Sequence, residues 1–222
     1  MQKLQKLNII YEDNHLLVVE KPSNIPVQED SSKDIDMLTL LKNYRKINEN
    51  KPGEAFIGLV HRLDRPVSGI MVFAKTSKAA SRLSEQIRRN LFHKTYLAVI
   101  TGTIPLKGKL EDYLIKDEKE NKSYITTKEK GKYSCLEYQV LDTKENLSLV
   151  EINLITGRSH QIRVQFSSRK NPLIGDSKYG HNPNNIDIAL FAKSITLIHP
   201  TTKEELTFTL DIPNKYPFNI FK

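Results

Sequence analysis

Alternating apolar and polar positions predict a chain built largely from short strands. The segment NIIYEDNHLLVVEKP, residues 8–22, reads as two strands around a turn at Asp13 and Asn14. The apolar run from Ile70 to Ala74 predicts a buried strand. Further strands are expected over 93–101, 110–116, 123–128, 133–141 and 147–155, and two more on either side of HPTTK within 188–213.

Apolar residues at helical spacing predict three helices between these strands. The first begins at Ile35, and its expected inner face is Leu38, Leu41, Tyr44 and Ile47. The second is capped by Thr76 or Ser77, with Ala80, Leu83 and Ile87 facing inward. The third begins near Ser159 and carries Ile162 and Phe166 on one face.

The order of these elements lacks a strict strand–helix–strand rhythm. It therefore predicts an α+β fold with a mixed, largely antiparallel central sheet and flanking helices and loops. No repeat, low-complexity segment or long linker divides the sequence, so we expect one domain over residues 1–222.

Composition narrows the class of protein. With 38% hydrophobic and 27% charged residues, the chain reads as globular, and its longest apolar runs are too short to cross a bilayer. The N-terminal MQKLQKLNII shows no secretory signal, so the cytoplasm is the expected compartment. Cys135 is the only cysteine, which excludes an intramolecular disulfide and a cysteine zinc cage, and it is expected in the core of a strand.

The formal charge of +8 is concentrated in two segments. Residues 61–94 hold eight Lys and Arg against two acids, and residues 158–180 hold five against one. The lysine-rich stretch 107–132 also carries six acids and reads as a solvated surface. Concentrated positive charge indicates a nucleic-acid partner, although charge alone does not separate RNA, DNA or an anionic membrane.

The stretch GLVHRLDRPVSGIMVFAKT, residues 58–76, places Asp64 between Arg62 and Arg65. A simple ion pair with a neighbouring arginine is the ordinary interpretation. The apolar and turn-forming surroundings and the two cations also suit a carboxylate that stays ionised and acts as a nucleophile.

The stretch LITGRSHQIRVQFSS, residues 154–168, collects Arg158, His160, Gln161 and Arg163 without an acid. Gly157 is expected to make a tight turn into a helix whose first N–H groups favour an anion, and a basic surface helix is the alternative. Arg163 lies near the edge of the expected buried face, where a half-buried arginine demands a carboxylate. Asp64 is a candidate partner.

Other residues carry weaker signals. A tyrosine such as Tyr96 in a strand is more often a core residue than a catalyst. The loop NPLIGDSKYG, residues 171–180, is expected to shape a pocket wall, with Asp176 as a cap. The histidines at 61, 160 and 199 form no metal-ligand spacing, and no Walker or dinucleotide glycine pattern occurs, so neither a metal nor a cofactor is expected.

Six segments in order along the chain resemble the motifs of the RluA-type pseudouridine synthases. HRLDRPVSGIMVFAKT resembles the signature HRLDxxTSG followed by an apolar strand, with Val67 where the family has threonine. The other five, covering about residues 9 to 213, are YEDNHLLVVEKPSNIPV, KTYLAVITG, ITGRSHQIRVQF, PLIGDSKYG and LFAKSITLIHP. The family often carries an N-terminal S4 RNA-binding domain. We expect none here, so that substrate capture falls to the catalytic domain.

The resemblance implies a role for each matching residue. Asp64 matches the catalytic aspartate, Tyr96 the active-site tyrosine and Arg163 the arginine that pairs with the aspartate. Ile162 matches an apolar pocket residue, and Arg62 matches an arginine that helps to displace the target base in some members. Four further residues of the same motifs are expected to contact the substrate: His61, Arg65, Arg158 and Gln161.

The implied function is a cofactor-independent RNA pseudouridine synthase, an isomerase that acts on a loop or junction uridine. Ribosomal RNA is the favoured substrate and transfer RNA the second, and a monomer suffices. A basic RNA-binding or assembly factor without catalysis is the alternative from another class, and a DNA-acting glycosidase is a third.

Overall fold

The computed structural model describes residues 7–49 and 53–222. Residues 1–6 of the N-terminal MQKLQKLNII and residues 50–52 of the polar loop after the first helix lie outside the described residues. The chain forms two compact units: the first is Met1–Phe92 with Ser194–Leu210, and the second is His93–Lys193 with Asp211–Lys222. The expectation of one domain over the whole chain stays a prediction.

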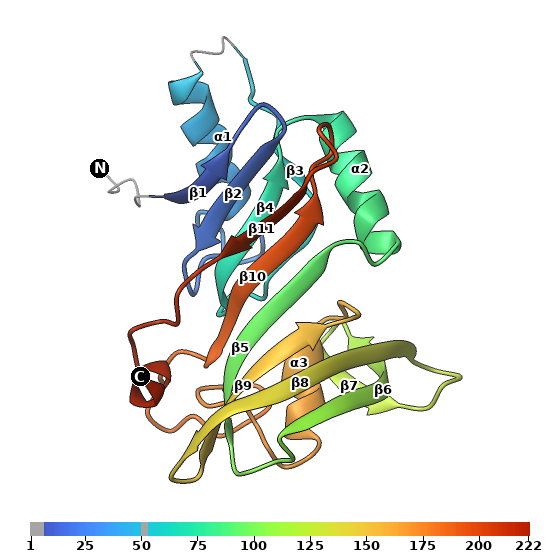
Figure 1. The fold of residues 1–222 in the computed structure, drawn as a ribbon, viewed down its shortest axis with the longest axis vertical. Coiled ribbons are helices and arrows are strands. Elements are labelled where there is room, and N and C mark those ends of the chain that lie inside the picture. The colour runs from blue at the N-terminus through green and yellow to red at the C-terminus, as the bar shows by residue number, and fades with distance from the viewer. Residues whose placement is uncertain (1–6, 50–52) are drawn as a thin grey trace. The chain divides into compact units, whose positions relative to one another are not determined.

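The first unit consists of antiparallel strands and two helices (Figure 1). β2 pairs with β1 on one side and with β4 on the other, β3 pairs with β4, and β10 pairs with β11. The elements are β1 (Asn8–Glu12), β2 (Leu16–Lys21), α1 (Met37–Asn48), β3 (Gly58–Leu59), β4 (Ser68–Ala74), α2 (Ser77–Arg88), the second half of β10 (Leu190–Ile198) and β11 (Glu205–Thr209).

Alternate residues of β2 and β4 build a core beneath α2. Because successive side chains of a strand point to opposite faces, one face of these two strands presents a continuous apolar surface. That cluster is completed by α2 and by the end of β10, and it contains Leu16, Val18, Ile70, Val72, Ala79, Leu83, Ile195 and Leu197.

Side-chain caps define where both helices begin. Asp36 Oδ1 accepts the Thr39 N–H at 3.1 Å before α1, and Thr76 Oγ1 accepts the Ala79 N–H at 3.1 Å before α2. The predicted cap of the second helix is therefore confirmed.

The predicted inner face of α1 is partly wrong. Leu41 is buried, but Ile47 is 63% exposed, and the buried apolar residues besides Leu41 are Met37 and Leu40. Leu38 and Ile47 are nine residues apart, which is 2.5 turns at 3.6 residues per turn, so the two side chains lie on opposite sides of the helix. Residues that are each three positions apart shift steadily around a helix. The buried residues Leu40 and Leu41 instead lie three and four positions after Met37, on one side of the helix.

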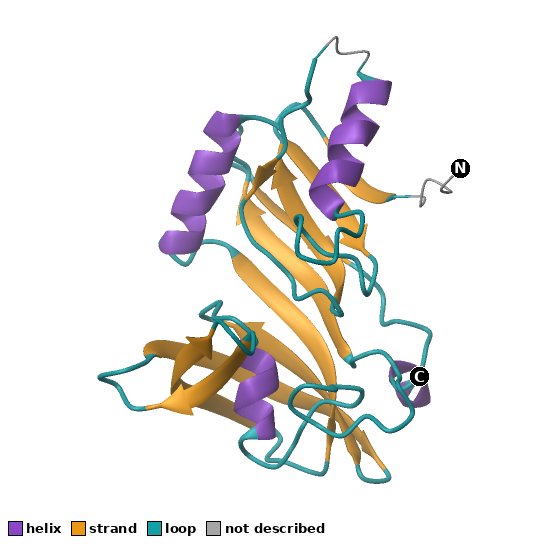
Figure 2. Ribbon diagram, turned by 180° about the vertical axis from the view of Figure 1, so that it is seen from behind, coloured by secondary structure: helices purple, strands orange, loops and turns teal. Residues whose placement is uncertain are grey.

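The second unit is an antiparallel sheet in the order β5-β9-β8-β6-β7. A short helix, α3, lies beside this sheet (Figure 2). The ring of Phe166 in α3 lies 5.7 Å from that of Tyr138 in β8. The elements are β5 (His93–Thr101), β6 (Lys107–Asp117), β7 (Lys122–Thr126), β8 (Lys132–Lys144), β9 (Leu147–Leu154), α3 (Gln161–Ser167), the first half of β10 and the 3₁₀ helix η1 (Phe218–Phe221). The α+β fold with largely antiparallel strands is thus confirmed.

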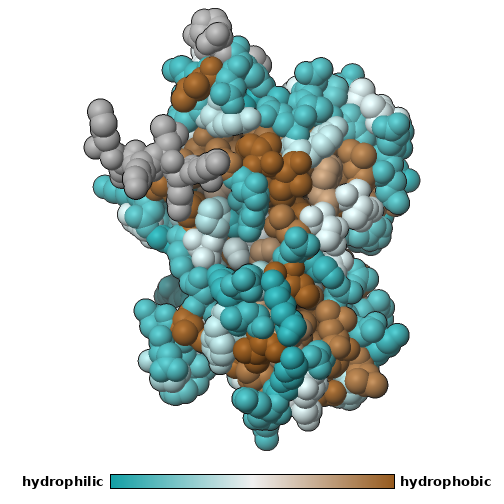
Figure 3. Space-filling view, turned by 60° about the vertical axis from the view of Figure 1, so that its left-hand side comes forward, coloured by the Kyte–Doolittle hydropathy of each residue, from teal (hydrophilic) through white to brown (hydrophobic). Residues whose placement is uncertain are grey.

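The face drawn in Figure 3 shows apolar patches among polar side chains. Its most exposed large apolar side chains include Leu106 at 75% and Ile47. Single exposed apolar residues are common on globular proteins, so they identify no binding surface by themselves. Among the helices of the described residues, none is long and apolar enough to cross a membrane.

Candidate active site

Asp64 lies in a tight turn between β3 and β4. Its carbonyl oxygen accepts the Val67 N–H at 3.0 Å, which closes the turn over Arg65 and Pro66. Leu63 and Val67 on either side are buried, and Asp64 itself is half-buried. Apolar anchors therefore fix both ends of the segment while the carboxylate keeps access to the surface. The apolar Val67 suits this buried position.

Arg65 makes ion pairs within the first unit. Its guanidinium contacts Asp34, lies 3.5 Å from Asp30 and donates to Ser32 Oγ at 2.8 Å and to the Asn24 carbonyl at 3.2 Å. The hydrogen bond to Asp34 is the main reason that the pKa of Arg65 is raised. Arg65 thus binds the loop before α1, and its expected contact with substrate stays a prediction. Arg62 is exposed.

His61 supports the edge of β4. Its Nε2 accepts the Val72 N–H at 3.0 Å, and its ring lies 5.4 Å from that of Phe92. An accepting Nε2 carries no proton, so the neutral ring holds its proton on Nδ1. β3 pairs with β4 at Ala74 and Phe73, and the His61 side chain accepts the N–H of Val72, the next residue of β4. His61 was expected to contact the substrate, and the structure adds this structural role.

Tyr96 lies in β5 and is buried, opposite Ile152 of β9. Lys94 is two residues earlier and therefore shares the same face of the strand. A Cβ added at Gly157 would lie 3.2 Å from Lys94 Nζ, so the lysine end packs closely against this glycine. Burial lowers the pKa of Lys94. The sequence interpretation missed this lysine, although its spacing from Tyr96 indicated the shared face.

The backbone before α3 differs from the predicted turn. The left-handed residue is His160, with φ 53°, and not Gly157. Gln161 Oε1 accepts the Arg158 N–H at 3.0 Å and the Thr156 hydroxyl at 2.8 Å, so the side chain serves this turn. The Arg158 N–H, which lies before the helix, is thus occupied, and the expectation that the N–H groups of the helix start favour an anion stays a prediction. Its Nε also donates to the Tyr133 carbonyl at 3.0 Å.

Arg163 is held by Asp176 in a buried ion pair. Nε and Nη2 of Arg163 donate to the two carboxylate oxygens at 2.8 and 2.7 Å, and the residues are 4% and 1% exposed. Burial alone would raise the pKa of Asp176, but the hydrogen bonds and charge of Arg163 outweigh it and hold the pKa below its usual value. Asp176 also caps its own loop by accepting the N–H groups of Lys178 and Tyr179 at 2.9 and 3.1 Å, as predicted.

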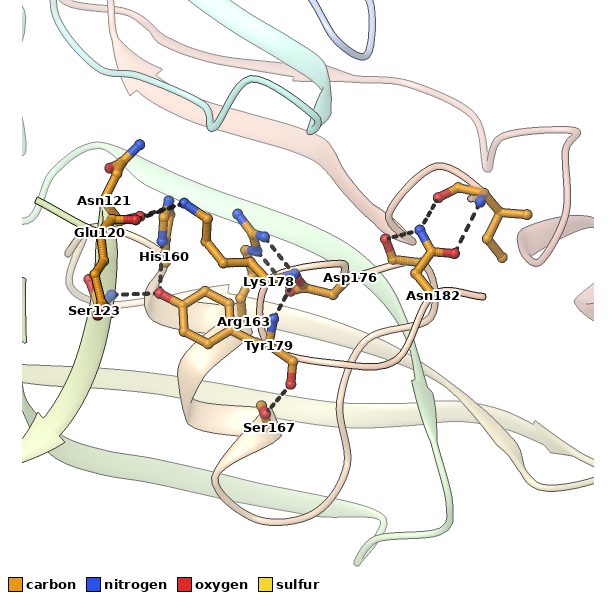
Figure 4. Close-up of polar contacts among 12 residues, drawn as sticks. Glu120, Asn121, Ser123, His160, Arg163, Ser167, Asp176, Lys178, Tyr179 and Asn182 are labelled. Atoms are coloured by element: carbon orange, nitrogen blue, oxygen red, sulfur yellow. Dashed lines mark hydrogen bonds and ion pairs between the residues drawn. The ribbon is translucent and has the colours of Figure 1, made fainter. Parts of the chain in front are cut away.

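Tyr179 connects three parts of the second unit (Figure 4). Its hydroxyl accepts the Ser123 N–H at 2.6 Å and hydrogen-bonds His160 Nδ1 at 2.8 Å. The Arg163 guanidinium lies 5.2 Å from the centre of its ring, within range of a cation–π contact. This tyrosine therefore joins β7, the start of α3 and the loop of Asp176 around Arg163. Sequence reasoning identified the loop but not the tyrosine.

The predicted site residues divide between the units. Asp64, Arg62, His61 and Arg65 belong to the first unit, whereas the second contains Tyr96, Arg158, Gln161, Ile162 and Arg163. Ile162 is buried in α3. The expected ion pair between Asp64 and Arg163 stays a prediction, and Asp176 is a second carboxylate partner that the sequence did not reveal. Within residues 7–49 and 53–222, no three His, Cys, Asp or Glu side chains gather as metal ligands.

Comparisons with known proteins agree with the motif resemblance. Residues 15–168 match the family described as RNA pseudouridylate synthase. The ribosomal large subunit pseudouridine synthase C of Buchnera aphidicola subsp. Baizongia pistaciae is 34% identical over 90% of this chain and 65% of the relative. The ribosomal large subunit pseudouridine synthase D of Zymomonas mobilis is 31% identical over 93% of this chain and 69% of the relative.

The fold is also shared with a solved structure. The human RNA pseudouridylate synthase domain containing 4 superimposes with a TM-score of 0.79 at 24% identity, covering 93% of this chain and 88% of the human chain. The chain spans about two thirds of the length of the curated relatives it matches, 65% in the case of the Buchnera protein. The match over residues 15–168 includes the Asp64 turn, β5 with Tyr96 and α3 up to Ser167, and by this match the chain belongs to the RNA pseudouridylate synthase family.

Proposed function

We propose that this protein is an RNA pseudouridine synthase that isomerises uridines in structured RNA. The reaction breaks the N1–C1′ glycosidic bond, turns the uracil and rejoins it to the sugar through C5. The observation that carries the proposal is the family match over residues 15–168, which contains Asp64, Tyr96 and Arg163 together.

Asp64 is the proposed catalytic carboxylate. Cleavage of the glycosidic bond builds positive character on the sugar, which an adjacent carboxylate stabilises or captures, as in retaining glycosidases. Two routes start from the ionised acid: attack on C1′, or assistance to proton removal that gives a glycal. In both routes no water is consumed, so the detached uracil must be retained.

Arg163 is proposed to orient Asp64 and keep it ionised. Asp176 supports this role within the second unit, because the two hydrogen bonds from Nε and Nη2 fix the plane of the guanidinium. A positive group beside a carboxylate favours its ionised form. Asp176 is thus a proposed support of the arginine.

Tyr96 and Ile162 are proposed to hold the base. A tyrosine ring stacks on uracil or aids proton transfer when the C5 proton leaves, and an apolar residue excludes water from the retained base. Both side chains are buried in the protein without substrate, at 6% and 4% exposure, which suits a pocket with little water.

The proposed substrate is RNA with a uridine in a loop or junction. A base must leave its stack to be reached, which costs least where pairing is already weak. Arg62 is exposed and is proposed to fill the vacated space, because a planar guanidinium stacks on bases. The remaining proposed contacts with the RNA strand are His61, Arg65, Arg158 and Gln161. Both relatives named above are called large-subunit pseudouridine synthases, so ribosomal RNA is favoured over transfer RNA. The protein is expected to act as a monomer in the cytoplasm.

Tritium release from RNA labelled at C5 of uridine tests the reaction directly. The substrates are in vitro transcripts of large-subunit ribosomal RNA and of transfer RNA, without added metal or nucleotide. Wild-type protein should release tritium, whereas Asp64→Asn should release none while it binds the RNA nearly as tightly. Asp142→Asn, which removes a partly exposed acid of β8 whose side chain is 43% exposed, is the control and should keep full turnover.

Two other outcomes contradict the proposal. Binding of RNA with no tritium release from total cellular RNA would support a non-catalytic binding or assembly factor. Free uracil among the products would indicate a glycosidase, because the synthase returns the base to the same sugar. Mapping of pseudouridines in total RNA with and without the gene then identifies the modified positions.

A further inference from the structure

Lys21, the last residue of β2, is fully buried, and no carboxylate among residues 7–49 and 53–222 forms an ion pair with its ammonium group. Its Nζ donates to the carbonyl oxygens of Pro22, Ile25 and Arg65 at 2.8, 2.7 and 2.9 Å. Lysine is almost never fully buried unless it is paired. Three carbonyls use all three N–H donors of an ammonium, whereas a neutral amine has only two donors and would turn its lone pair toward a carbonyl. The geometry therefore suits the charged form.

These hydrogen bonds connect two segments that are far apart in the sequence. The Pro22 and Ile25 carbonyls belong to the loop after β2, and the Arg65 carbonyl belongs to the turn that carries Asp64. Arg65 supplies a second connection, because its Nε donates to the Asn24 carbonyl of the same loop. The Asp64 turn is thus attached to the end of β2 by one buried side chain and by one exposed side chain.

The backbone opposite Lys21 is also unusual. In the β2–β4 ladder Lys21 is paired with Gly69, whose φ of 122° lies in a region that other residues rarely adopt. Gly69 lies five residues after Asp64 and directly before Ile70, the first residue of β4 in the core cluster. The end of β2 is therefore joined to both sides of the Asp64 turn: Lys21 bonds the Arg65 carbonyl within the turn and pairs with Gly69 just after it.

Lys21 and Asp64 also interact through their charges. Burial lowers the pKa of Lys21 to about 7, the charge of Asp64 opposes this change, and the charge of Arg65 adds to it. Such an electrostatic interaction is mutual, so Asp64 in turn lies in the field of the Lys21 ammonium. Since its donors are all occupied by carbonyls, Lys21 acts on Asp64 without a hydrogen bond to it.

We propose that Lys21 is a positioning residue for Asp64. Its ammonium holds the Arg65 carbonyl, which fixes the turn, and adds a positive charge near the carboxylate while leaving the carboxylate oxygens to other partners. This inference rests on the proposed function, in which Asp64 is the catalytic group. Because Lys21 is 0% exposed, it does not touch RNA in this arrangement. Its loss should therefore lower kcat and leave KM nearly unchanged.

Lys75 offers a matched control in the same unit. It follows β4, is also buried, and its Nζ lies 2.6 Å from Glu12 Oε1 and 3.0 Å from Glu49 Oε1. Lys75→Met removes a buried lysine and its ion pairs with both acids, of which Glu49 keeps Arg45 as a partner, so it tests the loss of a buried lysine charge. Its ion pairs are with β1 and the end of α1, away from the Asp64 turn.

The first measurement is steady-state kinetics of tritium release from large-subunit ribosomal RNA labelled at uridine C5. The full-length Lys21→Gln and Lys75→Met variants are compared with wild type at a temperature where circular dichroism shows each to be folded. Lys21→Gln keeps a polar donor but loses the charge and one N–H; its kcat should fall by about 10- to 100-fold, with KM within about twofold. Lys75→Met should leave both constants within about twofold.

The second measurement does not depend on catalysis. Amide hydrogen exchange at Val67 reports the hydrogen bond that closes the Asp64 turn, and it should accelerate by about tenfold or more in Lys21→Gln but not in Lys75→Met. Unchanged exchange at Val67 overturns the proposal whatever the activity, and so does a folded Lys21→Gln with the kcat of wild type. If wild type itself releases no tritium, the proposed function fails, and the exchange measurement still decides whether Lys21 fixes the turn.

Discussion

Two buried cations, one in each unit, support the candidate catalytic segments in different ways. Arg163 in the second unit faces the carboxylate of Asp176, whereas Lys21 in the first unit faces three backbone carbonyls. In the arginine pair the charge is matched by an opposite charge at contact distance, and the guanidinium keeps its proton at any ordinary pH. The lysine ammonium donates to backbone carbonyls, and burial lowers its pKa to about 7, so its charge is lost far more easily. The second unit thus holds its cation permanently, and the first holds one that titrates.

The largest effect is expected from breaking the arginine pair. Asp176→Asn removes the carboxylate that accepts two hydrogen bonds from the buried Arg163 and should reduce the free energy of unfolding by about 3–5 kcal/mol. Because the chain has no tryptophan, urea unfolding is best followed by far-UV circular dichroism.

Asp187→Asn is the matched control for that variant. Asp187 pairs with Lys215 at 2.9 Å, but both side chains are about two-fifths exposed, at 39% and 42%. Its loss should therefore cost less than about 1 kcal/mol. Equal losses in the two variants would show that burial does not distinguish these pairs.

The titration of Lys21 should appear in the pH dependence of stability. Its pKa is about 7 in the folded protein and 10.5 in the unfolded chain, so between these values the unfolded state binds more protons. The free energy of unfolding of wild type should therefore rise with pH relative to Lys21→Met, by at most about 1.4 kcal/mol per pH unit. Below about pH 7 both states hold the proton, and the difference between the two proteins should be constant. Urea midpoints of both proteins across this window measure the slope, and parallel curves would contradict it.

A smaller effect should follow from loosening the surroundings of Arg163 without removing its charge partner. Tyr179→Phe keeps the ring over the guanidinium but removes the hydroxyl bonded to Ser123 and His160. An unsatisfied buried N–H at Ser123 should cost about 1–3 kcal/mol in the urea titration. A loss as large as that of Asp176→Asn would mean that the hydroxyl, and not the carboxylate, is the main support of this cluster.

The smallest effect is expected from the ion pairs of Arg65, the partly exposed arginine that follows Asp64. Asp34→Asn removes one of its ion-pair partners, and the two side chains are 39% and 55% exposed. Solvent screens such a pair, so the urea midpoint should stay within experimental error of wild type. A clear shift of the urea midpoint would show that the loop before α1 depends on this ion pair despite its exposure to solvent.

Strands were predicted well because their signal is local. The apolar run within HKTYLAVIT gave the bounds of β5 as the structure has them, 93–101, and a cap at Thr76 or Ser77 indicated the start of α2. The inner face of α1 failed because apolar residues three apart were treated as one stripe. The roles of Asp64, Tyr96 and Arg163 came from motif order and not from periodicity, and they stay predictions.

The supporting contacts could not be predicted because they join distant positions. Lys21 and Arg65 are 44 residues apart, and the sequence does not state which carbonyls a lysine will meet. A local signal existed all the same: Lys21 ends the apolar run LLVVEK on the face of Leu17 and Val19, both buried. A lysine on the inward face of a strand indicates a buried, bonded ammonium. The net charge of a segment is also an incomplete guide. Arg65 and Lys75 count as positive charges of residues 61–94, but they form ion pairs with acids outside that segment, Asp34 and Glu12.

The interleaving of the two units constrains how the chain is made. The first unit is interrupted after Phe92 and resumes only at Ser194, and its core includes Ile195 and Leu197. At about 5–20 residues per second, a ribosome needs roughly 5 to 20 s to supply the missing part. Throughout that interval the apolar surface of β2, β4 and α2 waits for strands that have not yet been synthesised. No single cut yields either unit complete, so isolated fragments should need a permuted chain, and a nascent chain stalled near residue 193 should be a target for chaperones.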